Sequence, residues 1–146
     1  MMRVGLAMLQ GARHEHEEAI LSIAEEFQQD IEVVHLRRAR DLDASIHGLI
    51  LPGGESTTMR IASRSEGLLD SIYAWMEAHP QRPVLGTCAG AFLLANPSDG
   101  RQPFIQAKIS RNAWGRQRQS FEAPIDVTLN RVETQGASIE RKPDVF

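Results

Sequence analysis

The sequence has 146 residues, the length of one ordinary domain, of which 42% are hydrophobic and 24% charged. The formal net charge of −3 argues against a nucleic-acid surface spread over the whole protein. A single cysteine excludes an internal disulfide and fits a reducing cytoplasm. No apolar run has the length of a signal peptide or a membrane span. We therefore expect one cytoplasmic globular domain over residues 1–146, with neither a nucleic-acid nor a membrane partner.

Apolar runs alternate with amphipathic segments through the first two thirds of the chain. The pattern predicts strands over residues 3–9, 32–36 and 47–51, with a further short strand before Cys88. It predicts helices over residues 14–28, 56–64 and 68–78 and from Ala89 to Ala95. The stripe expected to be apolar and buried in the first helix consists of Ile20, Ile23, Ala24 and Phe27.

This alternation predicts an α/β fold of three layers, a mostly parallel sheet flanked by helices, similar to flavodoxin. Ligands of such sheets bind at the carboxyl ends of the strands. Three of the predicted strands are followed by residues typical of a site, namely Gln10-Gly11, Gly53-Gly54 and Cys88. We expect all three to open on one edge of the sheet, which points to a site there. Beyond a turn at residues 96–100, strands are expected over 104–110 and 125–129, as antiparallel extensions.

The only cysteine lies in the sequence Gly86-x-Cys88-x-Gly90, between a predicted strand and a predicted helix. This is the spacing of a nucleophile elbow, with cysteine in the place of serine. A residue at the apex of such a turn has a strained backbone, and a Cβ two positions away on either side would clash. The helix N-terminus favours a thiolate. The alternative is a buried structural thiol, which is common for lone cysteines.

Gly53-Gly54 follows a strand and precedes a helix. Its backbone N–H groups could hold a carboxylate or a developing oxyanion. Ser56 or Thr57 could cap the following helix while presenting further donors. The alternative is a plain turn with a helix cap.

Other candidates are weaker. One of Arg111, Arg116 and Arg118 could clamp a substrate carboxylate, or all three could belong to a solvated loop. A thiol nucleophile requires an imidazole base. Among the histidines, His14, His16 and His35 stay open as candidates, although each is more typical of a surface or packing position. No metal-ligand spacing and no phosphate-binding loop occur, so neither a metal nor a cofactor is expected.

The strings Leu9-Gln10-Gly11, Pro52-Gly53-Gly54-Glu55-Ser56-Thr57-Thr58-Met59, Gly86-Thr87-Cys88-Ala89-Gly90 and Arg111-Asn112-x-x-Gly115-Arg116-Gln117 stand in this order. Together they resemble the glutaminase subunits of pyridoxal 5′-phosphate (vitamin B6) synthase, the PdxT family of class I glutamine amidotransferases. The resemblance runs from Met2 to the last residues. It implies hydrolysis of L-glutamine to L-glutamate and ammonia through a cysteine thioester. It also implies a partner, the PdxS-like barrel subunit of the synthase, which receives the ammonia.

The resemblance also implies the roles of individual residues. Cys88 matches the nucleophile, and Gln10 matches a residue of the loop near the oxyanion and the partner interface. The matches to the glutamine-binding residues are Gly53, Gly54, Glu55, Ser56 and Arg111.

The family pattern continues beyond a Val-Phe pair to a His-Pro-Glu motif that supplies the base and its orienting acid. The present sequence ends at Val145-Phe146, so its C-terminal part is expected to be incomplete and the chain to have little or no glutaminase activity. Two alternatives stay open. One is a non-catalytic homologue that binds the synthase or glutamine, and the other is a different cysteine hydrolase of the superfamily.

Overall fold

The computed structural model describes residues 1–11, 13–97, 99–110, 123, 124 and 126. The chain divides into two compact units, Met1–Ile109 and Ser110–Phe146. All helices and strands described below lie in the first unit. Only residue 126 of the predicted strand over 125–129 is among the described residues, so that strand stays a prediction, as does a single domain over 1–146.

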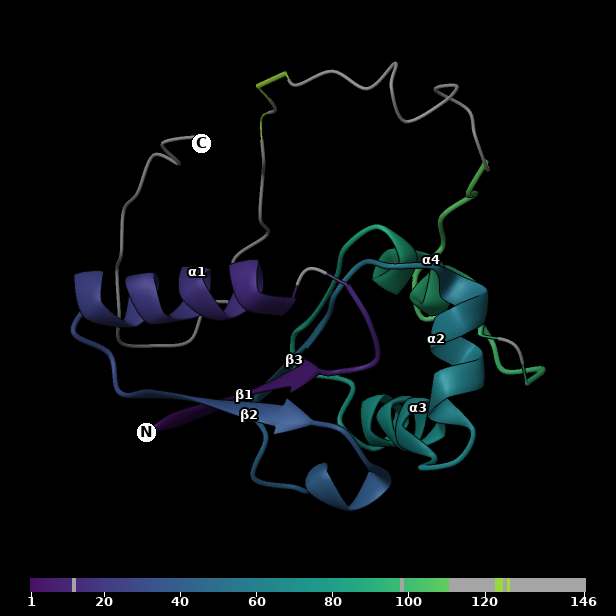
Figure 1. Ribbon diagram of the computed structural model, residues 1–146, viewed down its shortest axis with the longest axis horizontal. Helices are drawn as coiled ribbons and strands as arrows, with labels where there is room; N and C mark the ends of the chain where they lie inside the picture. Colours follow the sequence, from purple (N-terminus) through teal and green to yellow (C-terminus); the bar gives the residue numbers. More distant parts are fainter. Residues whose placement is uncertain (12, 98, 111–122, 125, 127–146) are drawn as a thin grey trace. The chain divides into compact units, whose positions relative to one another are not determined.

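Four parallel strands form the sheet (Figure 1). They are β1 (Met2–Ala7), β2 (Ile31–Leu36), β3 (Gly48–Leu51) and β4 (Val84–Gly86), in the order β2-β1-β3-β4. Val4 pairs with Val33 on one side and with Gly48 on the other, which sets the register of the three longer strands. The order reverses between β1 and β3, and open parallel sheets bind ligands at such a switch point. The predicted α/β fold with a mostly parallel sheet is confirmed.

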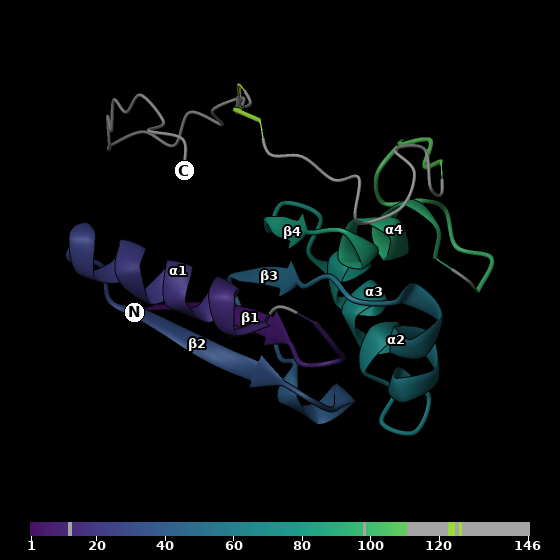
Figure 2. The same cartoon turned by 45° about the horizontal axis from the view of Figure 1, so that its top comes forward.

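The helices follow the strands with which they alternate in the sequence. The first is α1 (Arg13–Glu26), and a short 3-10 turn, η1 (Ala39–Asp41), follows β2. The others are α2 (Ser56–Ser63), α3 (Leu68–Ala78) and α4 (Ala89–Ala95). Figure 2 shows α1 lying along β1 and β2, while α2, α3 and α4 gather near the ends of β3 and β4. Predicted and observed ends agree to within two residues, the usual scatter of helix and strand boundaries.

The main core lies between the sheet and α3. Ile72 and Trp75 of α3 pack with Leu49 and Leu51 of β3 and with Leu36 of β2 in one buried cluster. Burial of a side chain of this size stabilises the fold by about 1.5–3 kcal/mol. The indole Nε1 of Trp75 donates a hydrogen bond of 3.1 Å to the carbonyl of Asp43, so the polar atom of this side chain is satisfied.

Helix α1 packs more loosely than its apolar stripe predicts. None of its residues is fully buried, and Ile23 is 50% exposed. The prediction of a buried stripe is therefore wrong at Ile23, while Ile20 and Ala24 are half-buried. Phe27 follows the last residue of the helix and is also half-buried.

The predicted strand over 104–110 is wrong, since these residues have no regular structure. Phe104 stacks on Tyr73, with ring centroids 5.4 Å apart, and its N–H donates to the carbonyl of Leu94. Ile105 and Ile109 are exposed. A strand needs a partner for its backbone groups, and no strand in the described ranges pairs with this segment.

Candidate active site

Cys88 occupies the apex of the turn between β4 and α4. Its backbone has φ 49° and ψ −114°, a conformation that residues other than glycine rarely adopt. The cysteine is exposed rather than buried in the core. Both observations fit the predicted nucleophile elbow and contradict a buried structural thiol. A strained residue of this kind persists only where its surroundings hold it in place.

The two glycines that flank Cys88 are required by close packing. A Cβ on Gly90 would lie 2.0 Å from the carbonyl oxygen of Leu51. A Cβ on Gly86 would lie 2.8 Å from the backbone nitrogen of Ala91 and 2.9 Å from the carbonyl carbon of Gly90. These neighbours are backbone atoms, which cannot rotate away. The spacing Gly86-x-Cys88-x-Gly90 is therefore a steric requirement of the turn, as predicted.

Gly53 faces the cysteine directly. A Cβ built on Gly53 would lie 3.0 Å from Cβ of Cys88 and 3.7 Å from its sulfur. The loop after β1 closes on the same place, because a Cβ on Gly11 would lie 1.7 Å from the carbonyl oxygen of Gly53. The structure thus brings together the three strand ends that the sequence marked. The shelf, as we call Gly53-Gly54 below, lies between the elbow and the loop at Gln10-Gly11.

Gln10 reaches over the shelf to Glu55. Its Oε1 accepts a hydrogen bond of 2.8 Å from the backbone N–H of Glu55 and lies 2.8 Å from where a Cβ of Gly54 would be. Gly54 has a φ of +147°, which favours glycine. Among the described residues, none accepts a recorded hydrogen bond from the N–H of Gly53 or Gly54. Within this part of the chain, both N–H groups are thus candidate donors to a ligand at the shelf.

The residue that caps α2 differs from the prediction. Neither Ser56 nor Thr57 does so; instead the carboxylate of Glu55 accepts hydrogen bonds from the N–H groups of Thr57 and Thr58, at 3.1 and 2.7 Å. These bonds, that of Thr58 first, lower the pKa of Glu55 from 4.5 to about 2. A negative charge at this end of a helix is also favoured by the helix dipole.

Of the three candidate histidines, His16 is the one that contacts the turn carrying Cys88. Nε2 of His16, on α1, lies 3.1 Å from Oγ1 of Thr87, the residue before the cysteine. His35 is paired instead with Glu17 at 3.0 Å, and His14 is exposed. Within the described ranges, no histidine is recorded as hydrogen-bonded to the sulfur of Cys88. The link between His16 and Thr87 was missed in the sequence because the two residues are 71 positions apart.

For the other predicted site residues, the structure gives fewer contacts. Ser56 is 8% exposed at the start of α2, close to the shelf in sequence. Arg111 lies outside the described residues, so its role stays a prediction. The described residues contain no group of three side chains suited to a metal ion. Nor does any helix among them have the length and apolar character needed to cross a bilayer.

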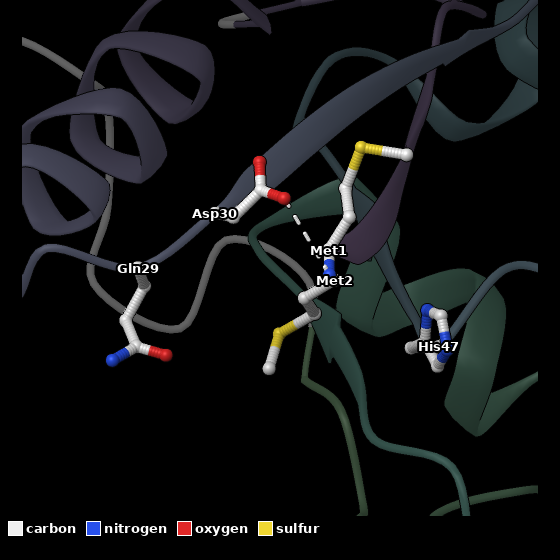
Figure 3. Close-up of a pocket in the computed structure, with 5 residues that line it drawn as sticks. All are labelled: Met1, Met2, Gln29, Asp30 and His47. Atoms are coloured by element: carbon white, nitrogen blue, oxygen red, sulfur yellow. Dashed lines mark ion pairs between the residues drawn. The ribbon is translucent and has the colours of Figure 1, made fainter.

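A hollow of about 420 Å³ lies away from this site (Figure 3). It is lined by Met1, Met2, Gln29, Asp30 and His47. These residues belong to the amino ends of β1, β2 and β3, the edge of the sheet opposite the elbow. The terminal amino group and Asp30 form an ion pair of 3.5 Å across it. The hollow contains no nucleophile, and we assign it no role in the chemistry.

Comparisons with known proteins identify the family and the fold. The model of the SNO glutamine amidotransferase family matches residues 6–145. The chain belongs to the SNO glutamine amidotransferase family. Among solved structures, one described as the crystal structure of glutamine amidotransferase is similar, with a TM-score of 0.61 and 35% identity. That match covers 82% of this chain and 62% of the solved chain.

Curated relatives in this family carry a more specific name. The pyridoxal 5′-phosphate synthase subunit PdxT of Methanothermobacter thermautotrophicus is 41% identical over 130 residues, 87% of this chain and 65% of the relative. The proteins of the same name from Thermococcus onnurineus and Haloarcula marismortui are 40% and 42% identical, with 68% and 65% of their lengths covered. The chain thus spans about two thirds of the length of these relatives.

Gly90→Ala is expected to lower the free energy of unfolding by at least about 2 kcal/mol, because the new Cβ would overlap the carbonyl oxygen of Leu51. Urea denaturation followed by circular dichroism measures the loss. Gly100→Ala is the control, since its Cβ would meet nothing within 4 Å and only the φ of +80° opposes it, by about 1 kcal/mol. An equal loss in both variants would contradict the assigned packing.

Glu55→Gln is expected to lower the melting temperature at pH 7. Because the folded pKa, about 2, lies below the unfolded value of 4.5, the carboxylate stabilises the fold above pH 4.5. That contribution is lost as the pH falls towards 2, so the difference from wild type should shrink over this window. Thermal melts at several pH values measure it, with Glu18→Gln on α1 as the control. A difference that does not change with pH would count against the capping role.

Proposed function

We propose that this chain is the glutaminase part of a pyridoxal 5′-phosphate synthase, with L-glutamine as substrate and Cys88 as nucleophile. The observation that carries the proposal is the exposed, strained Cys88 with Gly53 facing it, a Cβ on Gly53 being 3.0 Å from that of the cysteine. L-glutamine is proposed as the substrate because the chain belongs to a glutamine amidotransferase family and is similar to proteins named PdxT. A reducing cytoplasm suits a reactive thiol, and we place the reaction there.

The chemistry follows from the arrangement. The sulfur of Cys88 attacks the carboxamide carbon of the glutamine side chain, and the C=O electron pair moves onto the oxygen. Gly53 of the shelf faces the cysteine, and the backbone N–H groups of the shelf are the proposed donors to that oxyanion. When the C–N bond breaks, the nitrogen takes up a proton and leaves as ammonia, and a thioester remains. Water then hydrolyses the thioester to L-glutamate and restores the thiol.

Two of these steps require an acid–base group. At neutral pH an unassisted thiol is mostly protonated, and departing ammonia needs a proton. In the family that the sequence resembles, a His-Pro-Glu motif supplies both functions. The present sequence has no histidine after His79.

Binding of the remainder of glutamine is assigned to residues around the shelf. Ser56 and the backbone of Glu55 follow Gly54 directly, while the Glu55 carboxylate is engaged as the helix cap. Gln10 and Arg111 complete the proposed set. We also propose that the ammonia passes to a barrel-shaped synthase subunit of the PdxS type, since the relatives are named as subunits of a synthase.

The first test uses a chloroketone analogue of L-glutamine, in which a chloromethyl ketone stands where the carboxamide is. The sulfur of Cys88 should displace chloride and form a C–S bond, with L-glutamine protecting the thiol. Mass spectrometry of the polypeptide of residues 1–146 locates and times the modification, and Cys88→Ser is the control. Labelling of Cys88 that glutamine does not slow would contradict a glutamine site at the shelf.

The second test concerns catalysis. A polypeptide of residues 1–146 is expected to release ammonia from glutamine roughly three to six orders of magnitude more slowly than an enzyme with its base. Fusion of the remaining third of the Methanothermobacter thermautotrophicus relative after Phe146 should restore at least about a hundredfold of that loss. Coupled glutamate detection measures both, and Cys88→Ala in the fusion should abolish the gain. Ammonia release by residues 1–146 alone at the rate of the fusion would overturn this expectation.

A further inference from the structure

His16 connects the first helix to the nucleophile turn. Its Nε2 lies 3.1 Å from Oγ1 of Thr87, and both side chains are partly buried. Thr87 is also held through its backbone, because its N–H donates to the carbonyl of Leu51 at 3.0 Å and its carbonyl accepts from Gly90 at 2.8 Å. The residue before the strained Cys88 is thus fixed by two backbone bonds and one side-chain bond.

The side-chain bond is significant because it joins α1 to the turn that carries Cys88. None of the residues of α1 is fully buried, so apolar packing alone leaves room for the helix to shift. Two of the polar links of this helix come from neighbouring residues: Glu17 bonds His35 of β2, and His16 bonds Thr87. Only the second of these links reaches the elbow.

The hydrogen bond between His16 and Thr87 also connects the two segments that lie on either side of the shelf. Helix α1 begins at Arg13, two residues after Gly11, whose backbone lies against the carbonyl of Gly53. On the other side, Gly53 lies against Cys88. A shift of α1 would therefore move the loop at Gln10 and the elbow apart, with the shelf between them.

We propose that His16 is a positioning residue for the reaction of Cys88, acting through Thr87. Its hydrogen bond holds the elbow in register with the shelf, so that the sulfur and the oxyanion donors face the same carboxamide. It is not assigned the role of the base. The inference rests on the proposed function, because register with the shelf has a consequence only for a substrate that uses both.

The test compares two reactions of Cys88 in the polypeptide of residues 1–146. Iodoacetamide needs only the thiol, whereas the chloroketone analogue of glutamine needs the thiol and the shelf together. His16→Ala should lower the rate ratio of chloroketone to iodoacetamide by about three- to tenfold, the effect of one hydrogen bond. His16→Gln, which places an amide nitrogen near the position of Nε2, should keep most of the ratio. His14→Ala, on the same helix turn but exposed, is the matched control.

The partner residue provides a second, independent arm. Thr87→Val should reproduce the loss and Thr87→Ser should avoid it, while His16→Ala with Thr87→Val together should fall no further than either alone. If His16→Ala fails to fold, the Thr87 pair alone decides the question.

The outcomes separate the two proposals. A ratio within twofold of wild type in folded His16→Ala and Thr87→Val, or a loss in His16→Gln equal to that in His16→Ala, would overturn the positioning role. A wild-type chain in which glutamine does not protect Cys88 would instead overturn the proposed function.

Discussion

The site depends on the absence of side chains at three glycines. Gly90 lets the elbow pack against the carbonyl of Leu51, Gly86 lets the chain turn under α4, and Gly53 lets the shelf approach the cysteine. A Cβ would overlap backbone atoms at Gly90 and Gly86, and at Gly53 it would crowd Cβ of Cys88 at 3.0 Å. Together they bring the exposed cysteine next to the backbone of Gly53, and the proposed chemistry needs that proximity.

The strand order of the sheet explains why these glycines lie close together. Since β1, β3 and β4 are adjacent and parallel, the loops that follow them leave the sheet at the same edge. The loops after the neighbouring strands β1 and β3 touch at Gly11 and Gly53, and the Gln10 side chain accepts a hydrogen bond from the N–H of Glu55. Topology therefore sets which loops meet, and local residue type sets how closely they approach.

The sequence predicted well the features that depend on local rules. The elbow was identified from glycine spacing around Cys88, and the parallel sheet from alternating apolar and amphipathic segments. Three other features were missed or wrong, of which one is a local cap and two depend on distant partners. Glu55 caps α2 although glutamate is not a preferred capping residue. The bond of His16 to Thr87 crosses 71 positions, and the apolar pattern at 104–110 was read as a strand although no strand pairs with it in the described part of the chain.

The backbone of Cys88 separates a structural from a functional interpretation of the thiol. A residue with this φ costs on the order of 1–3 kcal/mol relative to an ordinary conformation. A cysteine retained for packing would recover such a cost by being buried, but this one is exposed. Glycine would adopt the same turn without a side-chain penalty. The strain is therefore best explained by what the turn presents, a thiol held clear of the sheet beside the shelf.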